Sequence, residues 1–183
     1  MNRRKLPFPQ SLPPHRPPPP PPAGRQKTGG NPPATAANLA RFRIRAQRRF
    51  YDELVQRMKN AHNIAIRKWR MSMTGVAYEL RYSNGRMKRM VSAPRPRSPV
   101  SACIFLHEVG HHAIGFRKFR PRCLEEYHVW QWAFAQMRRY GIPINPRVLR
   151  HYRRSMYHYV RLARRRGLRQ LPPILGEFQS WPE

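Results

Sequence analysis

A nearly all-apolar segment, Val100 to Gly115, most strongly constrains the fold, because a helix without a polar face must lie at the centre of a domain. It contains the pattern H-E-x-x-H. Positions four apart lie one turn apart on the same helix face, so His107 and His111 can direct two imidazole nitrogens at one metal ion. Glu108 would lie beside that metal, where a carboxylate that is not a ligand can take a proton from water and pass it to a leaving amine.

The boundaries of this helix follow from its flanking residues. Ser98 is a favourable N-cap and Pro99 a favourable first residue, so we expect the helix to begin there and to end at Gly115. Gly110 lowers helix propensity within it, which indicates that another element packs closely against this position. Both histidines would then be buried, and a low-dielectric surround strengthens metal binding and controls the access of water.

Acidic residues are scarce, with 8 Asp and Glu against 37 Lys and Arg, yet Glu108, Glu125 and Glu126 fall within one short region. Apolar spacing predicts a second helix from about Leu124 to Tyr140, and the two later glutamates lie at the start of its inward stripe. A buried carboxylate requires an ion-pair partner or a cation, so either can be the third metal ligand. The alternative is an acid at a helix N-terminus that interacts only with the helix dipole.

The net charge of +29 and the pI near 11.8 are extreme. They predict a polyanionic partner, most simply nucleic acid, either DNA or RNA. No stretch of about 18 residues is free of charge, and the segment Met1 to Leu12 is interrupted by prolines and has no continuous apolar region. We therefore expect no transmembrane helix, no membrane partner, no secretory signal and a cytoplasmic location.

The composition divides the chain into three parts. Residues 1–36 carry 12 of the 21 prolines and no acid, so we expect a disordered basic tail that lies on nucleic acid phosphates or binds a partner domain. Residues 37–167 have the periodic apolar pattern of one domain with flanking basic helices. Residues 168–183 are predicted to form a loosely packed C-terminal tail, whose docking side chains are expected to be Ile174, Leu175, Phe178 and Trp181.

Two further elements precede the apolar helix. Helical spacing from Asn38 to Trp69 predicts one long helix, with a break near 60–63 as an alternative. A β-hairpin is then expected, because Val76–Tyr82 alternates in polarity, Asn84-Gly85 predicts a type I′ turn, and the chain returns over residues 87–92. Two strands alone are marginally stable, so this hairpin must pack on the helices.

A third helix is predicted from Asn145-Pro146 to Gly167, with an inward face that includes Tyr159 and an outward face of arginines. Exposed arginines with few opposing acids favour contact with phosphates. The predicted nucleic-acid-binding residues are Arg147, Arg150, Arg153, Arg154, Arg161, Arg164, Arg165 and Arg166, together with Arg45, Arg48 and Arg49 of the first helix.

The two motif helices resemble the gluzincin class of zincin metallopeptidases, especially the minimal gluzincins and ImmA/IrrE-like proteins. In that class, H-E-x-x-H supplies two zinc ligands and the base, and a following helix supplies a glutamate in a pattern like E-x-x-A-D-x-W/F-A. The residues from Glu126 to Ala133 fit this pattern loosely over a resemblance of about 40 residues. The resemblance implies Glu126 as the third ligand, with Glu125 as the runner-up. Trp130 stands where the family has an acid that orients a ligand histidine.

The SprT-like group is a related alternative in which a histidine, here His128 or His151, would be the third ligand. The gluzincin resemblance implies a mostly helical α+β fold of the minimal zincin type with a small antiparallel hairpin. It also implies a zinc-dependent peptidase that hydrolyses peptide bonds of a protein or peptide substrate, located on nucleic acid by its basic surface. The alternative function is a non-catalytic ribonucleoprotein component on a zincin scaffold.

Overall fold

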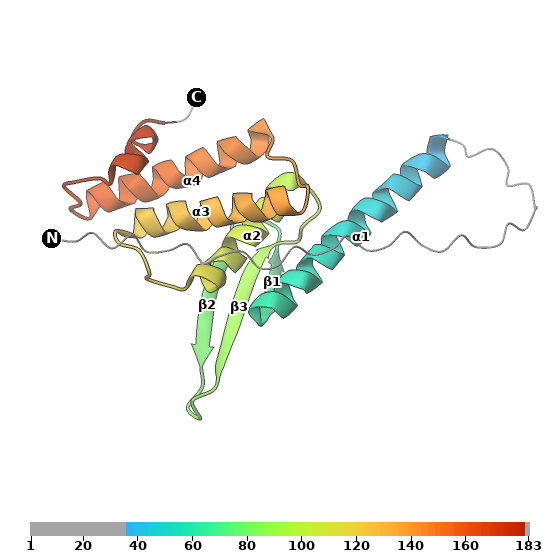
Figure 1. Ribbon diagram of the computed structural model, residues 1–183, viewed down its shortest axis with the longest axis horizontal. Helices are drawn as coiled ribbons and strands as arrows, with labels where there is room; N and C mark the ends of the chain where they lie inside the picture. The colour runs from blue at the N-terminus through green and yellow to red at the C-terminus, as the bar shows by residue number, and fades with distance from the viewer. Residues whose placement is uncertain (1–35, 182–183) are drawn as a thin grey trace, which may run out of the picture. The chain divides into compact units, whose positions relative to one another are not determined.

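The structure, a computed structural model, describes residues 36–181 and has the predicted α+β class. Most of the described residues are helical, and one small sheet accompanies the helices (Figure 1). The predicted proline-rich tail lies outside the described residues. The elements in chain order are α1 (Ala36–His62), β1 (Ile64–Arg70), β2 (Val76–Arg81), β3 (Met87–Pro94), α2 (Pro99–Ile114), α3 (Arg122–Arg139), α4 (Pro146–Arg165) and the 3-10 helix η1 (Pro173–Phe178).

The prediction of one helix from Asn38 to Trp69 is wrong after His62, and the alternative of a break near residues 60–63 gives the correct position for the end of α1. Asn63 has a φ of 50°, in the left-handed region, and this conformation ends α1. The chain then extends as β1, where β-branched Ile64 and Ile66 favour a strand. In so short a segment, the apolar spacing fits both the 3.6-residue period of a helix and the two-residue period of a strand. Pairing with β3, more than twenty residues later in the chain, determines that the segment is a strand.

The sheet has the strand order β1-β3-β2 and is mixed rather than purely antiparallel. The predicted hairpin is present as β2 and β3, which pair antiparallel with Val76 opposite Ser92 and Arg81 opposite Met87. The unpredicted β1 pairs parallel with β3 on the other side. β3 is therefore the central strand, and its Val91 side chain is fully buried.

The turn of the hairpin differs from the predicted type I′ turn. The Gly85 N–H donates to the carbonyl oxygen of Tyr82 at 3.0 Å, and the Tyr82 N–H donates to that of Arg86 at 2.8 Å, so three residues connect the strands. Gly85 has a φ of 79°, but Asn84 does not have the positive φ that type I′ requires. The connection is instead a three-residue loop that ends in a left-handed glycine.

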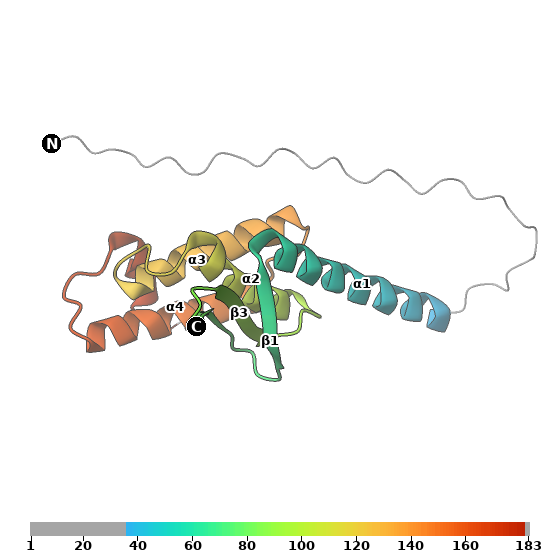
Figure 2. The same ribbon diagram turned by 90° about the horizontal axis from the view of Figure 1, so that it is seen from below.

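The predicted apolar helix is confirmed as α2. Ser98 caps it by accepting a hydrogen bond from the Ser101 N–H, and Pro99 occupies the first turn. Every side chain from Ser101 to His112 is buried, because α2 packs against α1, β2, β3, α3 and α4 (Figures 1 and 2). No helix within residues 36–181 is long and apolar enough to cross a membrane.

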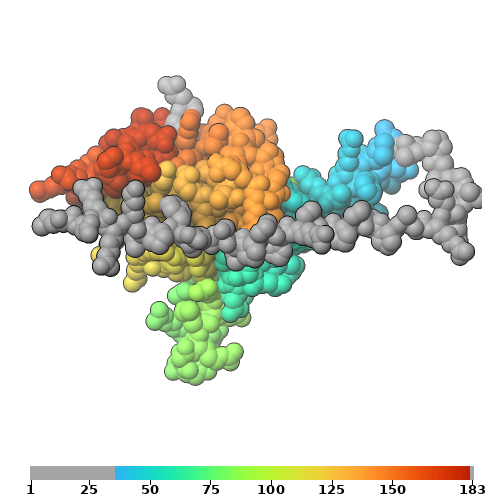
Figure 3. Space-filling view, in the orientation of Figure 1, coloured from blue at the N-terminus to red at the C-terminus, as the bar shows by residue number. Residues whose placement is uncertain are grey.

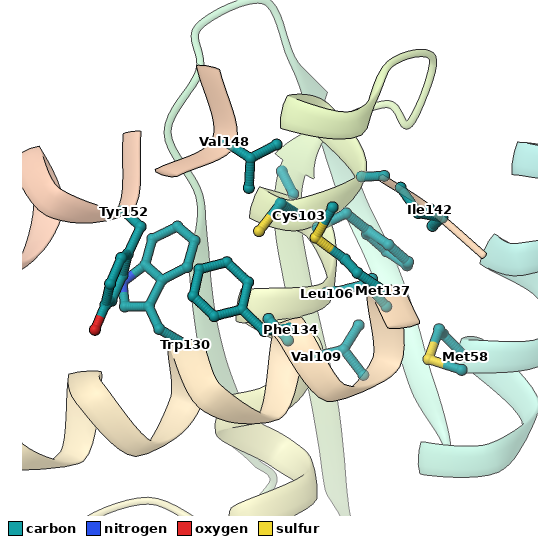
Figure 4. Close-up of a cluster of buried hydrophobic side chains, with 14 of the residues drawn as sticks. Met58, Cys103, Leu106, Val109, Trp130, Phe134, Met137, Ile142, Val148 and Tyr152 are labelled. Carbon is teal, nitrogen blue, oxygen red and sulfur yellow. The ribbon is translucent and has the colours of Figure 1, made fainter. Parts of the chain in front are cut away.

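The core lies where α2, α3 and α4 meet, and it contains Leu106, Phe134, Met137 and Tyr152 (Figure 4). The segment after α4 joins this core, because Leu175 and Phe178 of η1 are also buried. Ile174 and Trp181, which were also expected to dock, are exposed. Residues 36–181 therefore share one continuous core.

Only the C-terminal half of α1 packs on this core. Tyr51, Leu54 and Met58 are buried, but Leu39 and Phe42 are 50% and 70% exposed. The N-terminal half extends beyond the other elements, as does the tip of the β2–β3 hairpin (Figures 1 and 3). The helical apolar pattern of this segment therefore identified the helix correctly, but not a buried face.

We predict that Gly110→Leu destabilises the fold. A Cβ atom at Gly110 would lie 3.0 Å from both Trp132 Cε3 and Val129 Cγ1, so α3 leaves no room for a side chain here. Overpacking should destabilise the fold by roughly 3 kcal/mol, whereas the higher helix propensity of leucine should stabilise it by about 1 kcal/mol. The free energy of unfolding should therefore fall by about 2 kcal/mol. Urea denaturation gives the measurement.

Gly176→Leu is the matched control, because no atom lies within 4 Å of a Cβ at that position. We expect it to change the unfolding free energy by less than about 0.5 kcal/mol. Equal unfolding midpoints for the two variants would contradict close packing of α3 on α2 at Gly110.

Candidate metal centre

Two helices bring three metal-ligating side chains together. His107 and His111 lie one turn apart on α2, and Glu126 faces them from α3. Glu126 Oε2 is 3.2 Å from His107 Nε2 and 3.6 Å from His111 Nε2, and all three side chains are buried. Their ligand atoms all lie within 4.8 Å of one another, so this group can hold a metal ion.

The spacing of these atoms suits a small divalent ion. Bonds of about 2.0–2.2 Å to a tetrahedral ion set the ligand atoms roughly 3.3 Å apart, close to the two distances above. Glu126 Oε2 is fully buried, yet it has no hydrogen bond of acceptable geometry within residues 36–181. A buried carboxylate oxygen that faces two imidazole nitrogens without such a bond is what a cation between them would satisfy.

Arg122 fixes the orientation of the Glu126 carboxylate. Its Nη2 and Nε atoms lie 2.7 Å and 2.8 Å from Glu126 Oε1, one helical turn away on α3. Burial alone would raise the pKa of Glu126, but the two facing imidazoles outweigh it and hold the pKa below its usual range. Glu126 therefore stays ionised, with Oε1 on Arg122 and Oε2 directed at the histidines.

Aromatic rings, rather than hydrogen bonds, hold the two imidazoles. In the described part of the chain, Nδ1 of His107 and Nδ1 of His111 have no hydrogen-bond partner. Trp130 packs on His107 with ring centroids 4.2 Å apart, and Phe116 stacks on His111 at 5.8 Å with an interplanar angle of 4°. Burial lowers the pKa of His107 to about 4, so its imidazole is neutral, the form that binds metals.

Glu108 is buried next to the three candidate ligands. Burial, with a smaller effect of the Glu126 carboxylate, raises its pKa to about 8, against the opposing effect of Arg122 and Arg70. The backbone at Gly75, just before β2, covers this side chain so closely that a Cβ there would collide with Cγ and Oε1 of Glu108. Glycine at this position is thus a condition for the observed Glu108 conformation.

The other candidate ligands do not join this group. Glu125 is buried, but its nearest cationic atom is Arg122 Nε at 3.9 Å, so the runner-up ligand lies outside the site. His128 stacks on Phe119, and His151 packs near Trp130 with ring centroids 5.9 Å apart. Of the candidate third ligands, Glu126 lies with His107 and His111 in the group that could hold a metal ion, and neither histidine of the SprT-like alternative does.

Sequence reasoning did not identify three residues of this site. Arg122 was missed because the chain has many arginines. Its position four residues before Glu126, which allows an ion pair within one helix, was the signal that could have identified it. Gly75 carried no local signal. Tyr159 of α4 was predicted to face inward, without a role in the site. Burial and the Glu126 and Glu108 carboxylates raise the pKa of its hydroxyl, which therefore remains protonated.

The predicted nucleic-acid-binding arginines are all exposed, both on α4 and on α1. Some have structural partners: Arg49 pairs with Glu53 at 2.8 Å, and the guanidinium group of Arg164 donates to the carbonyl oxygen of Arg169 at 2.6 Å. Arg154 lies over the ring of Trp181. The remaining members of the set offer a basic surface on two helices.

Comparisons of the chain with protein-family models, with curated proteins and with solved structures returned no match. The gluzincin resemblance therefore remains a prediction, supported by the residues quoted for it. The metal-ligating group, in contrast, follows from the geometry of His107, His111 and Glu126 alone.

We predict that the chain binds one zinc ion and that Glu126→Gln abolishes this binding. The amide keeps the shape of the side chain but removes an anionic ligand. Loss of an outer-shell partner lowers metal affinity about 10–100-fold, so loss of a direct ligand should exceed roughly 100-fold. Competition with a chromophoric chelator measures the affinity.

Glu125→Gln is the matched control, because Glu125 is the adjacent buried glutamate and lies outside the metal-ligating group. It should retain the zinc stoichiometry of the unaltered chain. The reverse order of the two affinities would assign the third ligand to Glu125.

Proposed function

We propose that the chain is a zinc-dependent metallopeptidase. The observation that carries this proposal is the convergence of His107, His111 and Glu126 around one point, with the buried Glu108 carboxyl group beside them. Three protein ligands of this type are typical of catalytic zinc sites, whereas structural sites use four. The gluzincin resemblance of the two helices supports the same function.

The donor set favours zinc. Two imidazoles and one carboxylate suit zinc best among common ions, because calcium and magnesium prefer oxygen ligands alone. When bound, zinc supplies a Lewis acid that lowers the pKa of water and polarises a carbonyl group. The ligand residues are compatible with this role, because His107 is neutral and Glu126 is ionised.

Glu108 is the proposed proton-transfer residue. Its pKa near 8 is close to neutral pH, where a carboxylate is most effective at both accepting and releasing a proton. It would accept the proton of the attacking water and give it to the amine that leaves. Tyr159, which keeps its proton, would donate a hydrogen bond to the oxygen on which negative charge develops.

The substrate would be an extended peptide that pairs with β2. This strand pairs only with β3 among the described strands, so its other edge has free backbone groups. It packs against α2 and follows directly after Gly75, which covers Glu108. A peptide added at that edge would run past the metal-ligating group, held by main-chain hydrogen bonds.

We predict that Glu108→Gln abolishes peptide hydrolysis and retains zinc. The amide cannot accept the proton of water, and loss of a general base lowers kcat/KM by about 10²–10⁴-fold. An unfolded protein incubated with the zinc-loaded chain, followed by mass spectrometry of the products, gives the measurement.

The control is Glu177→Gln, the same substitution at an exposed position of η1. It should leave hydrolysis and zinc content unchanged. Full activity in the Glu108→Gln protein would rule out this mechanism. Zinc binding by the unaltered chain without any hydrolysis would instead favour the non-catalytic scaffold.

A second function, nucleic-acid binding, is favoured by the arginines of α4. Seven of the predicted arginines lie on α4 and the eighth, Arg166, is its C-cap; all eight are exposed, and the helix contains no acidic residue. Such a face attracts phosphates and releases their counterions. We propose that this surface locates the peptidase on DNA or RNA.

We predict that replacing Arg150, Arg153 and Arg161 together by glutamine weakens nucleic-acid binding at low salt. Each lost phosphate contact lowers the slope of log K against log salt by about 0.9, so the slope should fall by up to roughly 2.7. Fluorescence anisotropy with a labelled duplex over a salt series measures it.

A triple variant of the β2–β3 hairpin, with Arg81, Arg86 and Lys88 replaced by glutamine, removes the same charge from other exposed positions. It should leave the slope nearly unchanged. Equal effects of the two triple variants would assign the binding to net charge rather than to α4.

A further inference from the structure

A cavity of about 340 Å³ lies between the beginning of α3 and the end of α4, which are side by side in Figures 1 and 2. This volume is in the range of small-ligand sites. One part of its wall is apolar and another is polar and basic. The apolar residues are Pro121, Leu162, Ala163 and Leu168, and the polar ones are Arg122, Tyr159 and Arg166.

The two arginines of the cavity have hydrogen-bond donors that bind no described residue. Arg122 uses Nε and Nη2 to hold Glu126, but its Nη1 has no hydrogen bond to any described residue. The guanidinium group of Arg166 makes no hydrogen bond or ion pair within residues 36–181. Guanidinium groups bind carboxylates with two parallel hydrogen bonds, so these two arginines suit one carboxylate ligand.

This cavity adjoins the metal-ligating group. Arg122 holds one oxygen of Glu126, and the other oxygen of the same carboxylate faces His107 at 3.2 Å. Tyr159 also lines the cavity, and the Glu126 and Glu108 carboxylates contribute, after burial, to the raised pKa of its hydroxyl. A ligand in the cavity that binds Arg122 would therefore contact the same guanidinium group that holds the Glu126 carboxylate.

We propose that this cavity binds the C-terminal residue of a peptide substrate, with its carboxylate on Arg122 and Arg166 and an apolar side chain against Leu162 and Leu168. The proposal rests on the proposed peptidase function and makes the chain a carboxypeptidase for apolar termini. Hydrolysis then breaks the last peptide bond. The hydroxyl of water goes to the carbonyl carbon, and its proton goes by way of Glu108 to the amine of the released amino acid.

The mixed lining favours an amino acid over a phosphate of nucleic acid. A phosphate group would leave the apolar walls of Leu162, Ala163 and Leu168 without a partner, whereas an apolar side chain buries against them at about 25 cal/mol per Å². An acidic side chain within a peptide would also reach the arginines. It lacks, however, the adjacent apolar group that a C-terminal leucine or phenylalanine provides.

The first test measures binding to the full chain without metal, so that it does not depend on hydrolysis. Calorimetry or NMR titration measures the binding of four probes: N-acetyl-leucine, N-acetyl-leucinamide, N-acetyl-aspartic acid α-amide and inorganic phosphate. We expect N-acetyl-leucine to bind at least tenfold more tightly than either amide. Equal affinities would overturn the proposal, and so would stronger binding of inorganic phosphate than of N-acetyl-leucine.

Variants locate the binding in the cavity. Arg166→Gln removes a guanidinium group that has no structural partner, and Ala163→Leu fills the apolar part of the cavity. Each should weaken N-acetyl-leucine binding at least tenfold. Arg169→Gln is the matched control, because Arg169 is exposed, carries the same charge and does not line the cavity, and it should bind as the unaltered chain does. An equal loss in all three variants would overturn the proposal.

A hydrolysis assay separates this inference from the proposed function. The zinc-loaded chain is given a peptide that ends in leucine and the same peptide with an amidated end. Release of leucine from the free peptide only supports the carboxypeptidase. Equal internal cleavage of both peptides overturns it but leaves the peptidase function intact. Absence of any hydrolysis by the zinc-loaded chain overturns the peptidase function itself.

Discussion

The Glu126 carboxylate is fully buried in a chain that has only eight acidic residues, and the packing of α3 on α2 depends on how its charge is compensated. A buried carboxylate destabilises a fold by several kcal/mol unless it is paired. Arg122 compensates one oxygen from α3 itself, and the histidines of α2 face the other. Because Gly110 allows α3 to approach α2 closely, the same contact that forms the core also forms the metal-ligating group.

The features that were predicted correctly from the sequence are those that depend on neighbouring residues within one helix. The caps of α2 and the four-residue spacing of His107 and His111 are properties of one helix, and both were recovered from the sequence. The missed features depend on distant pairing. β1 is a strand because β3 lies beside it, and Gly75 matters because its loop crosses Glu108 more than thirty residues away. Neither the apolar spacing nor the residue propensities within these two segments indicate such contacts with distant residues.

Trp130 changes how the site is held rather than whether it forms. In the resembled family an acid at this position accepts a hydrogen bond from a ligand histidine, which fixes the ring and increases its basicity. Here the indole fixes the His107 ring by packing at 4.2 Å, but it cannot accept its proton. The imidazole is therefore oriented without a partner that would increase its basicity, so the affinity for a metal would depend more on the ionised Glu126 and on Arg122, which holds it.

The two faces of α4 link the basic surface to the site. Its 3.6-residue period turns Tyr152, Met156 and Val160 into the core and the arginines into solvent, whereas Tyr159 and Leu162 fall between these faces and line the cavity. Exposed charges interact over about 8–10 Å at physiological salt, so the arginines of α4 also act on an anion in that cavity. A polyanion bound along α4 would neutralise part of this field. The proposed attraction of a substrate carboxylate and the proposed attachment to nucleic acid would therefore use the same charges.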